Sequence, residues 1–99
     1  MSLLVNYSLK SPGHHESQKI AMTDLVEGLK SENITGLHYS CFSTDSPLHF
    51  IGVLEFEDDA AKQSFLSSAA FATYREKVGP TFANPPKTTE IVPIATTRD

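Results

Sequence analysis

Two histidines fall inside predicted strands, and their side chains are the best suited in the chain to acid–base chemistry: His38 and His49. An imidazole titrates near neutral pH, so it can take up a proton and return it under physiological conditions. His38 alternates in step with Phe42, and this parity places it on one strand face. His49 alternates in step with Ile51, which predicts both imidazoles on the same face of a sheet and near each other across a hairpin. Two interpretations stay open: a catalytic pair, or histidines whose hydrogen bonds are satisfied in a core or an interface.

Asn6, Tyr74 and Arg75 are further candidates for a small-molecule site. The Asn6 amide can bind a substrate carbonyl or phenolate, or it can be satisfied by water or a neighbouring helix. The Arg75 guanidinium can stabilise an anionic substrate or enolate, or it can form a surface or dimer salt bridge. Since adjacent helical residues diverge by about 100°, we expect at most one of Tyr74 and Arg75 to point into a pocket. Tyr74 is the more natural core aromatic, with its hydroxyl at the edge of the core.

Other reactive side chains do not form a recognisable site. His14 and His15 are adjacent at a helix start and cannot face one ion, so a solvated first turn is expected there. Cys41 is the single cysteine, which leaves it without a disulfide partner and predicts a small core residue. The chain has no glycine-rich phosphate loop, nucleophile elbow or zinc-ligand spacing. We therefore expect no metal and no cofactor.

Composition restricts the class of protein. The chain has 99 residues, of which 39% are hydrophobic and 20% charged, so we expect one globular domain spanning residues 1–99. The net charge is -4 and the eight Lys and Arg residues do not cluster, which argues against nucleic acid and anionic membranes as partners. No apolar run approaches a membrane span and no signal peptide is recognisable, so a cytoplasmic location is expected.

Hydrophobic periodicity predicts four strands and two helices in the order β-α-β-β-α-β, which is the ferredoxin-like arrangement. The predicted strands cover residues 3–10, 36–44, 48–56 and 88–96. The predicted helices cover residues 14–31 and about 59–78. Asp58 or Asp59 can cap the second helix, and Ser67 and Ser68 can start a new helical segment within it. Pro93 cannot donate to a ladder, which places it at an edge or a bulge.

The predicted sheet is apolar on both faces. One face of the first strand carries Leu3, Val5, Tyr7 and Leu9, while Ile51 and Val53 lie on the opposite face of the third strand from Phe50 and Leu54. Two helices cover only one face of a four-stranded antiparallel sheet. Burial of the second face would stabilise an association by roughly 25 cal/mol per Å². We therefore predict a homodimer with sheet packed against sheet, the alternative being scattered exposed apolar residues.

The run SFLSSAAFATYREKVGPTFANPP, together with the preceding FIGVLEFEDDAAKQ, resembles the antibiotic biosynthesis monooxygenase-like family of dimeric α+β barrels. The resemblance covers nearly the whole chain in architecture and residues 50–86 in motif. Haem-degrading members use a first-strand Asn, a second-helix Trp and a His ten residues further on. Asn6 matches the Asn, whereas Phe65 and Arg75 stand in place of the Trp and the His. Because Arg is a poor iron ligand, the resemblance argues against haem binding.

The resemblance implies two functions that stay open. One is a cofactor-independent monooxygenase that holds a small aromatic or quinol-type substrate and lets its anion react with O₂. Its site would use His38, His49 and Arg75 as catalytic residues and Asn6, Phe65 and Tyr74 as substrate-binding residues. The other is a non-catalytic dimeric protein that binds a small ligand or responds to stress.

Overall fold

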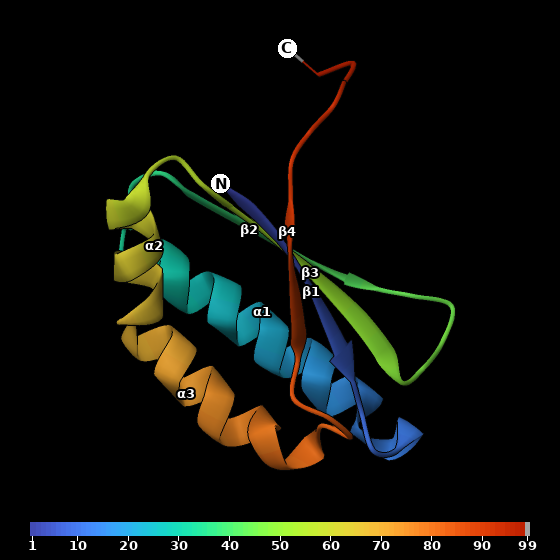
Figure 1. The fold of residues 1–99 in the computed structure, drawn as a ribbon. Helices are drawn as coiled ribbons and strands as arrows, with labels where there is room; N and C mark the ends of the chain where they lie inside the picture. The colour runs from blue at the N-terminus through green and yellow to red at the C-terminus, as the bar shows by residue number, and fades with distance from the viewer. Residues whose placement is uncertain (99) are drawn as a thin grey trace.

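The computed structural model describes residues 1–98 and contains a four-stranded antiparallel sheet with helices on one side (Figure 1). The strands are β1 (Ser2–Ser8), β2 (Leu37–Ser43), β3 (His49–Phe56) and β4 (Lys87–Ile91). The helices are α1 (His15–Ser31), α2 (Asp59–Leu66) and α3 (Ala69–Val78), with single 3-10 turns at Pro12–His14 and Gly79–Thr81. The strand order β2-β3-β1-β4 and the chain order confirm the predicted ferredoxin-like α+β fold.

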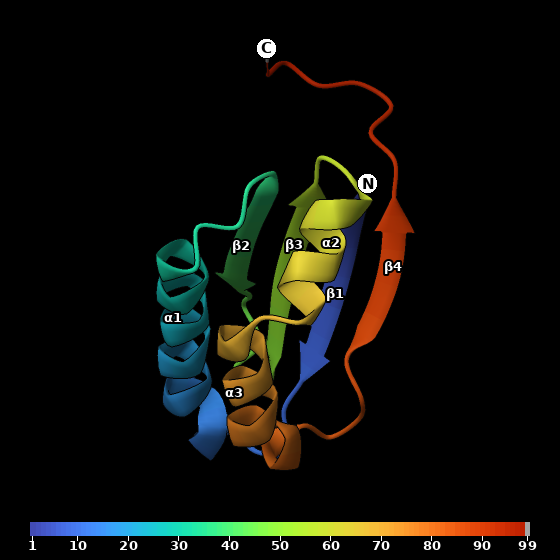
Figure 2. The same cartoon turned by 90° about the vertical axis from the view of Figure 1, so that its left-hand side faces the viewer.

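The inner face of the sheet, defined as the face toward the helices, carries the core. Helix α1 lies beside β2, and α2 and α3 lie over β3 and β1, whereas no helix lies over β4 (Figure 2). Strand parity groups Val5, Tyr7, Phe50 and Leu54 on this face, and all four are buried. Each helix packs its apolar side against these strand residues; in α1 this side includes the buried Leu25. Alternation along the strands therefore separates a buried inner set of residues from an outer set.

The predicted second helix is divided into α2 and α3, so the inner face carries three helices instead of two. Ser68 has an extended backbone (φ -69°, ψ 145°), and its hydroxyl accepts a hydrogen bond from the Phe71 N–H at 3.0 Å. This is a helix N-cap, and it confirms the new helical segment expected at Ser67 and Ser68. Asp58 caps α2 in the same way by accepting from the Ala61 N–H at 2.9 Å. The break lets α3 change direction and approach α1.

Helices α1 and α3 meet at an unusually short distance. A Cβ atom placed on Gly28 would lie 2.7 Å from the Cβ of Ala70, so this approach requires a glycine. The backbone N–H of Ala70 also donates to the Glu32 carboxylate at 3.1 Å, which ties the start of α3 to the end of α1. These contacts fix the position of α3 over the sheet.

The outer face of the sheet, opposite the helices, is bare in the single chain (Figure 1). Phe42 is 50% exposed there, and Leu4, Ile51 and Val53 are partly exposed. The last predicted strand is shorter than expected and ends at Ile91, so Pro93 follows the strand instead of lying in it. Beyond it, Val92 and Ile94 are 77% and 101% exposed. A homodimer is not part of this structure, and its basis remains this bare apolar face.

Candidate functional site

A cavity of about 330 Å³ lies between the inner face and helices α2 and α3, on the side toward β4. Its floor is formed by inward-facing strand residues, which include Val5 and Leu54. Phe65 of α2 and Phe71 of α3 form an aromatic wall, with ring centroids 4.5 Å apart. The size is at the small end of ligand pockets in proteins, and the predominantly apolar lining is typical of them.

Three of the residues predicted for the site line this cavity. Phe65 is 5% exposed and Tyr74 is 4% exposed, so both belong to the wall. Arg75 is exposed and lies at the rim, with its guanidinium carbon 4.9 Å from the centre of the Phe71 ring. Tyr74 and Arg75 both line the cavity, contrary to the expectation that at most one would do so. Adjacent helical residues diverge by about 100°, so Tyr74 lies at the buried wall while Arg75 lies at the exposed rim.

A hydrogen bond between two tyrosines crosses the core under the cavity. The hydroxyls of Tyr7 and Tyr39 lie 2.8 Å apart, so one donates to the other. Gly52, which pairs with Val5 and Cys41, leaves room for the two rings. A Cβ atom on Gly52 would lie 3.0 Å from Tyr39 and 3.2 Å from Tyr7. The glycine in the middle of β3 therefore permits this hydrogen bond.

A second buried hydrogen bond holds Tyr74 from behind. Gln18 of α1 is 1% exposed, and its Nε2 donates to the Tyr74 hydroxyl at 2.7 Å. The rings of Tyr7 and Tyr74 meet edge to face, with centroids 6.4 Å apart. The Gln18 Oε1 is buried and has no partner within the described part of the chain. The amide and the neighbouring ring thus fix the orientation of Tyr74 at the cavity wall.

Burial keeps the tyrosine hydroxyls protonated. Removal from water raises the pKa of Tyr7 to about 12, although its hydrogen bond to Tyr39 acts in the opposite direction. Burial also raises the pKa of Tyr39 and of Tyr74, and the neighbouring phenols add to both shifts. The pKa of the Cys41 thiol is raised by burial as well, which agrees with its expected role as a core residue. At neutral pH the cavity wall offers neutral hydroxyls and no thiolate.

Asn6, His38 and His49 lie on the outer face, so the sheet separates them from the cavity. The histidines share that face, as predicted, but His38 pairs with Glu55 and His49 lies six residues earlier on the same strand. At 3.3 Å per residue this separation is about 20 Å. Asn6 pairs with Ile51 and is exposed. The structure therefore divides the six predicted site residues into two groups on opposite faces.

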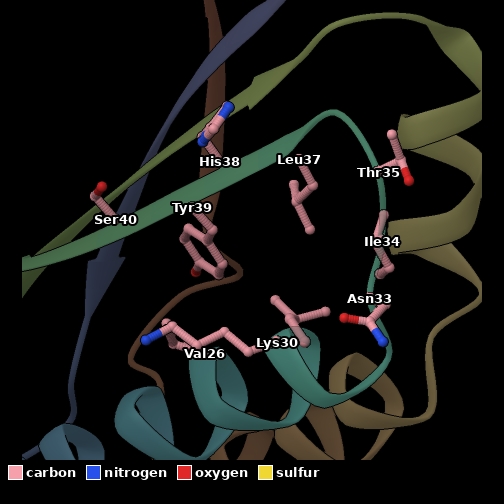
Figure 3. Close-up of a pocket in the computed structure, with 10 residues that line it drawn as sticks. Val26, Lys30, Asn33, Ile34, Thr35, Leu37, His38, Tyr39 and Ser40 are labelled. Atoms are coloured by element: carbon pink, nitrogen blue, oxygen red, sulfur yellow. The ribbon is translucent and has the colours of Figure 1, made fainter.

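A second hollow, a groove of about 730 Å³, lies between the end of α1 and the edge strand β2 (Figure 3). Figure 3 shows Tyr39 pointing from β2 into the groove and His38 pointing away on the other side of the strand. Lys30 supplies a charged group, and Asn33 and Thr35 supply polar ones. Tyr39 is the single Phe, Tyr or Trp side chain among the described residues of this lining, whereas the smaller cavity is lined by several aromatic rings, so the groove is the weaker candidate for aromatic ligands.

The rest of the described chain adds no site for an ion. Residues 1–98 contain no group of three His, Cys, Asp or Glu side chains placed to hold a metal. His15 is partly buried: its Nδ1 lies 3.0 Å from the Pro47 carbonyl oxygen, and its ring lies against Phe50. This contact corrects the solvated first turn expected at that position. Within the same residues, no helix has the length and apolar character needed to cross a membrane.

Tyr7 and Gln18 contribute to the site although neither was predicted to do so. Tyr7 was assigned only to one apolar face of the first strand, and Gln18 is one polar residue among several on α1. The available signal was Gly52, because a glycine inside a strand often marks a close approach of neighbouring groups. No pattern in the sequence marks Gln18, because its contact with Tyr74 depends on how α3 packs against α1.

Comparisons with solved structures identify the same fold in other proteins. A Nitrosomonas europaea protein provisionally described as an antibiotic biosynthesis monooxygenase matches with a TM-score of 0.79 and 18% identity, over 96% of this chain and 100% of that one. A second antibiotic biosynthesis monooxygenase matches at 0.75 and 18% identity, over 94% and 100%. A Nitrosomonas europaea protein of unknown function matches at 0.78 and 16% identity, over 99% and 92%.

No family model and no curated protein matches the sequence. At these identities the structural matches establish the fold. The chain thus has the fold of the antibiotic biosynthesis monooxygenase-like proteins, and the resemblance found in its sequence is confirmed at that level.

Proposed function

We propose that the cavity binds a small aromatic or quinol-type molecule and that the protein acts on it as a cofactor-independent monooxygenase. The observation that carries this proposal is the cavity of about 330 Å³ whose wall is built from Phe65, Phe71 and Tyr74. Aromatic walls favour planar ligands through edge-to-face and offset contacts, each worth roughly 0.5–1.5 kcal/mol beyond the burial of area. The names of the structural neighbours support the same class of reaction.

In this reaction the substrate supplies the electrons and O₂ is the oxidant. A phenol or an acidic C–H loses its proton to water at the open rim, and the anion that is left reacts with O₂. One oxygen atom enters the substrate as a carbonyl oxygen, and the other leaves as water together with two hydrogens from the substrate. Arg75 at the rim would stabilise that anion, since a preorganised cation near developing charge lowers its energy. The ring of Tyr74, held in place by the hydrogen bond of its hydroxyl to Gln18, would define the position of the substrate. Asn6, His38 and His49 could take part only through a site on the outer face.

Oxygen consumption tests the activity. We expect oxygen uptake above background with at least one member of a panel of quinols and hydroxylated aromatics. Leu66→Trp should reduce that rate at least tenfold, because Leu66 is 47% exposed at the cavity and a larger ring there fills the entrance. Ile20→Trp is the matched control, since Ile20 is 57% exposed on α1 and lies outside the cavity lining. Background uptake with the whole panel would refute the oxygenase.

The second candidate is a non-catalytic binding protein that uses the same cavity. One observation favours it: the cavity wall in the single chain holds no group with a pKa near neutrality that could take a proton, because its tyrosines are shifted upward. Retention of an aromatic ligand by the wild type, together with background oxygen uptake, would support this role. Loss of that retention in Leu66→Trp would assign it to the cavity.

The proposed partner is a second copy packed through the outer face. On this face Phe42 of β2 pairs with Ile51 of β3, and Leu4 of β1 pairs with Val53, two residues further along β3. Paired side chains on adjacent strands lie close together, so the sheet of a second copy packed on this face can cover all of them at once. Burial by a second copy would remove these partly exposed apolar side chains from water.

Sedimentation measures this association. We expect a species of twice 10.8 kDa at micromolar concentration. Val53→Lys should raise the dissociation constant at least a hundredfold, because it buries a charge without a partner. Ile20→Lys on α1 should leave the association unchanged. A wild type that sediments as a single chain would refute the dimer and leave the cavity proposal standing.

A further inference from the structure

Arg75 alone carries a charge among the residues that line the cavity within residues 1–98. The ion pairs of the described chain join Lys19 to Glu16 and Arg98 to Glu55, and neither uses Arg75. The chain has a net charge of -4, yet Arg75 forms no ion pair with any carboxylate of residues 1–98. Its charge is available to a ligand at the rim.

The guanidinium is held in place by an aromatic ring. It lies 4.9 Å from the centre of Phe71, and Phe71 in turn packs on Phe65. A cation over a ring face is attracted by the ring quadrupole, which favours this position of the side chain. Because the planar guanidinium has its N–H groups in a fixed fork, it can bind a carboxylate through two parallel hydrogen bonds.

Inside the rim, the polar groups of the cavity wall already have partners. The Tyr7 hydroxyl is bonded to Tyr39, and the Tyr74 hydroxyl accepts from Gln18. Thr88 on β4 and Arg75 are exposed residues at the lining, so they lie at its solvent side. The cavity thus has an apolar interior and an exposed rim, at which Arg75 carries a positive charge. A complementary ligand has an apolar body and one acidic group at its end.

We propose that the cavity selects aromatic carboxylates, with the ring system against Phe65 and Phe71 and the carboxylate paired with Arg75. This inference rests on the proposed ligand-binding cavity and adds its specificity. A body of one or two rings suits a volume of about 330 Å³. The ion pair between Arg75 and the carboxylate stays partly hydrated at the rim, so its desolvation costs little. The pair therefore gives the cavity a preference for the acid over a neutral molecule of the same shape.

Two matched probes measure the preference: 2-naphthoate, and 2-naphthamide, which keeps the shape but lacks the charge. Titration calorimetry of the full chain should give a dissociation constant at least tenfold lower for 2-naphthoate. Arg75→Gln should remove the difference by weakening 2-naphthoate about tenfold while leaving 2-naphthamide unchanged. Arg98→Gln is the matched control, because it removes an exposed arginine outside the cavity lining and should change neither affinity.

Further variants separate the specificity from the cavity itself. Leu66→Trp should weaken both probes, since it blocks the entrance, and Arg75→Lys should keep only part of the preference because an ammonium lacks the fork. Equal binding of the two probes to the wild type, or equal weakening of both by Arg75→Gln, would overturn the specificity while the cavity stands. Failure of both probes to bind at millimolar concentration would overturn the cavity and the proposed function with it.

Discussion

The two faces of the sheet have the same strand alternation but different surroundings. On the inner face, helices bury aromatic rings around a cavity and close a set of tyrosine hydrogen bonds. On the outer face, residues of similar apolar character lie beside Asn6, His38 and His49 with no cover from the chain. Strand alternation alone thus makes both faces apolar, and the position of the helices determines which face encloses a cavity and which stays uncovered.

The largest expected difference between the faces is in their contribution to folding. Phe50→Ala should lower the free energy of unfolding by about 3–5 kcal/mol, because Phe50 is 2% exposed and its removal leaves a cavity. Phe42→Ala should cost roughly 1 kcal/mol or less in the isolated chain, since half of Phe42 is already in water. Urea denaturation at low protein concentration measures both. Equal losses of unfolding free energy in the two variants would contradict this difference, because Phe42 would then be as tightly packed in the isolated chain as Phe50.

Alkaline pH should act on the inner face. The folded pKa of Tyr7 is raised to about 12 from the usual 10. The neutral phenol is favoured in the folded state, so its stabilising effect is complete below pH 10 and is lost as the pH rises to about 12. The free energy of unfolding should fall in this window by about 1.4 kcal/mol per pH unit for this group, with Tyr39 and Tyr74 adding to the slope.

Urea titrations between pH 9 and 11.5 measure that slope, and Tyr7→Phe should reduce it in addition to any constant loss from the missing hydrogen bond. Because the chain has three tyrosines, all in this cluster, and no tryptophan, ultraviolet absorbance offers a direct control. The native protein should show no phenol ionisation near pH 10. Ionisation at that pH in the folded protein would place the hydroxyls in contact with water and contradict the closed inner face.

The smallest effects are expected for the outer-face histidines. His38→Ala and His49→Ala should change the free energy of unfolding by about 0.5 kcal/mol or less, since both are exposed. They should also leave the binding of 2-naphthoate unchanged, because the sheet lies between them and the cavity. A tenfold loss of binding in either variant would connect the two faces and revive a catalytic role for the imidazoles at the cavity.

Local and alternating features of the chain were predictable from its sequence. The face shared by Leu3, Val5 and Tyr7, a helix cap at Asp58 or Asp59 and a new helix start near Ser68 depend on a few neighbouring residues, and the structure contains all three. The allocation of site residues to a face was harder. Parity groups His38 and His49 together, but it does not say on which side the helices lie relative to Arg75.

The remaining features depend on register and on helix packing, which single-sequence patterns do not encode. Tyr7 and Tyr39 are brought together by two strand registers and by Gly52 between them. Gln18 reaches Tyr74 only because α3 begins at Ser68 and runs back along α1. A contact of this kind appears when three elements are assembled, so no periodicity in any one of them predicts it.

The tight contact of Gly28 with Ala70 has a consequence for ligand size. Helix α3 carries Phe71, Tyr74, Arg75 and Val78, so its position determines the width of the cavity. A single methyl group added at Gly28 would force α3 outward, because the two Cβ atoms would otherwise stand only 2.7 Å apart. Gly28, although it lies outside the cavity lining, thereby limits the width of the cavity and the size of a molecule that could enter it.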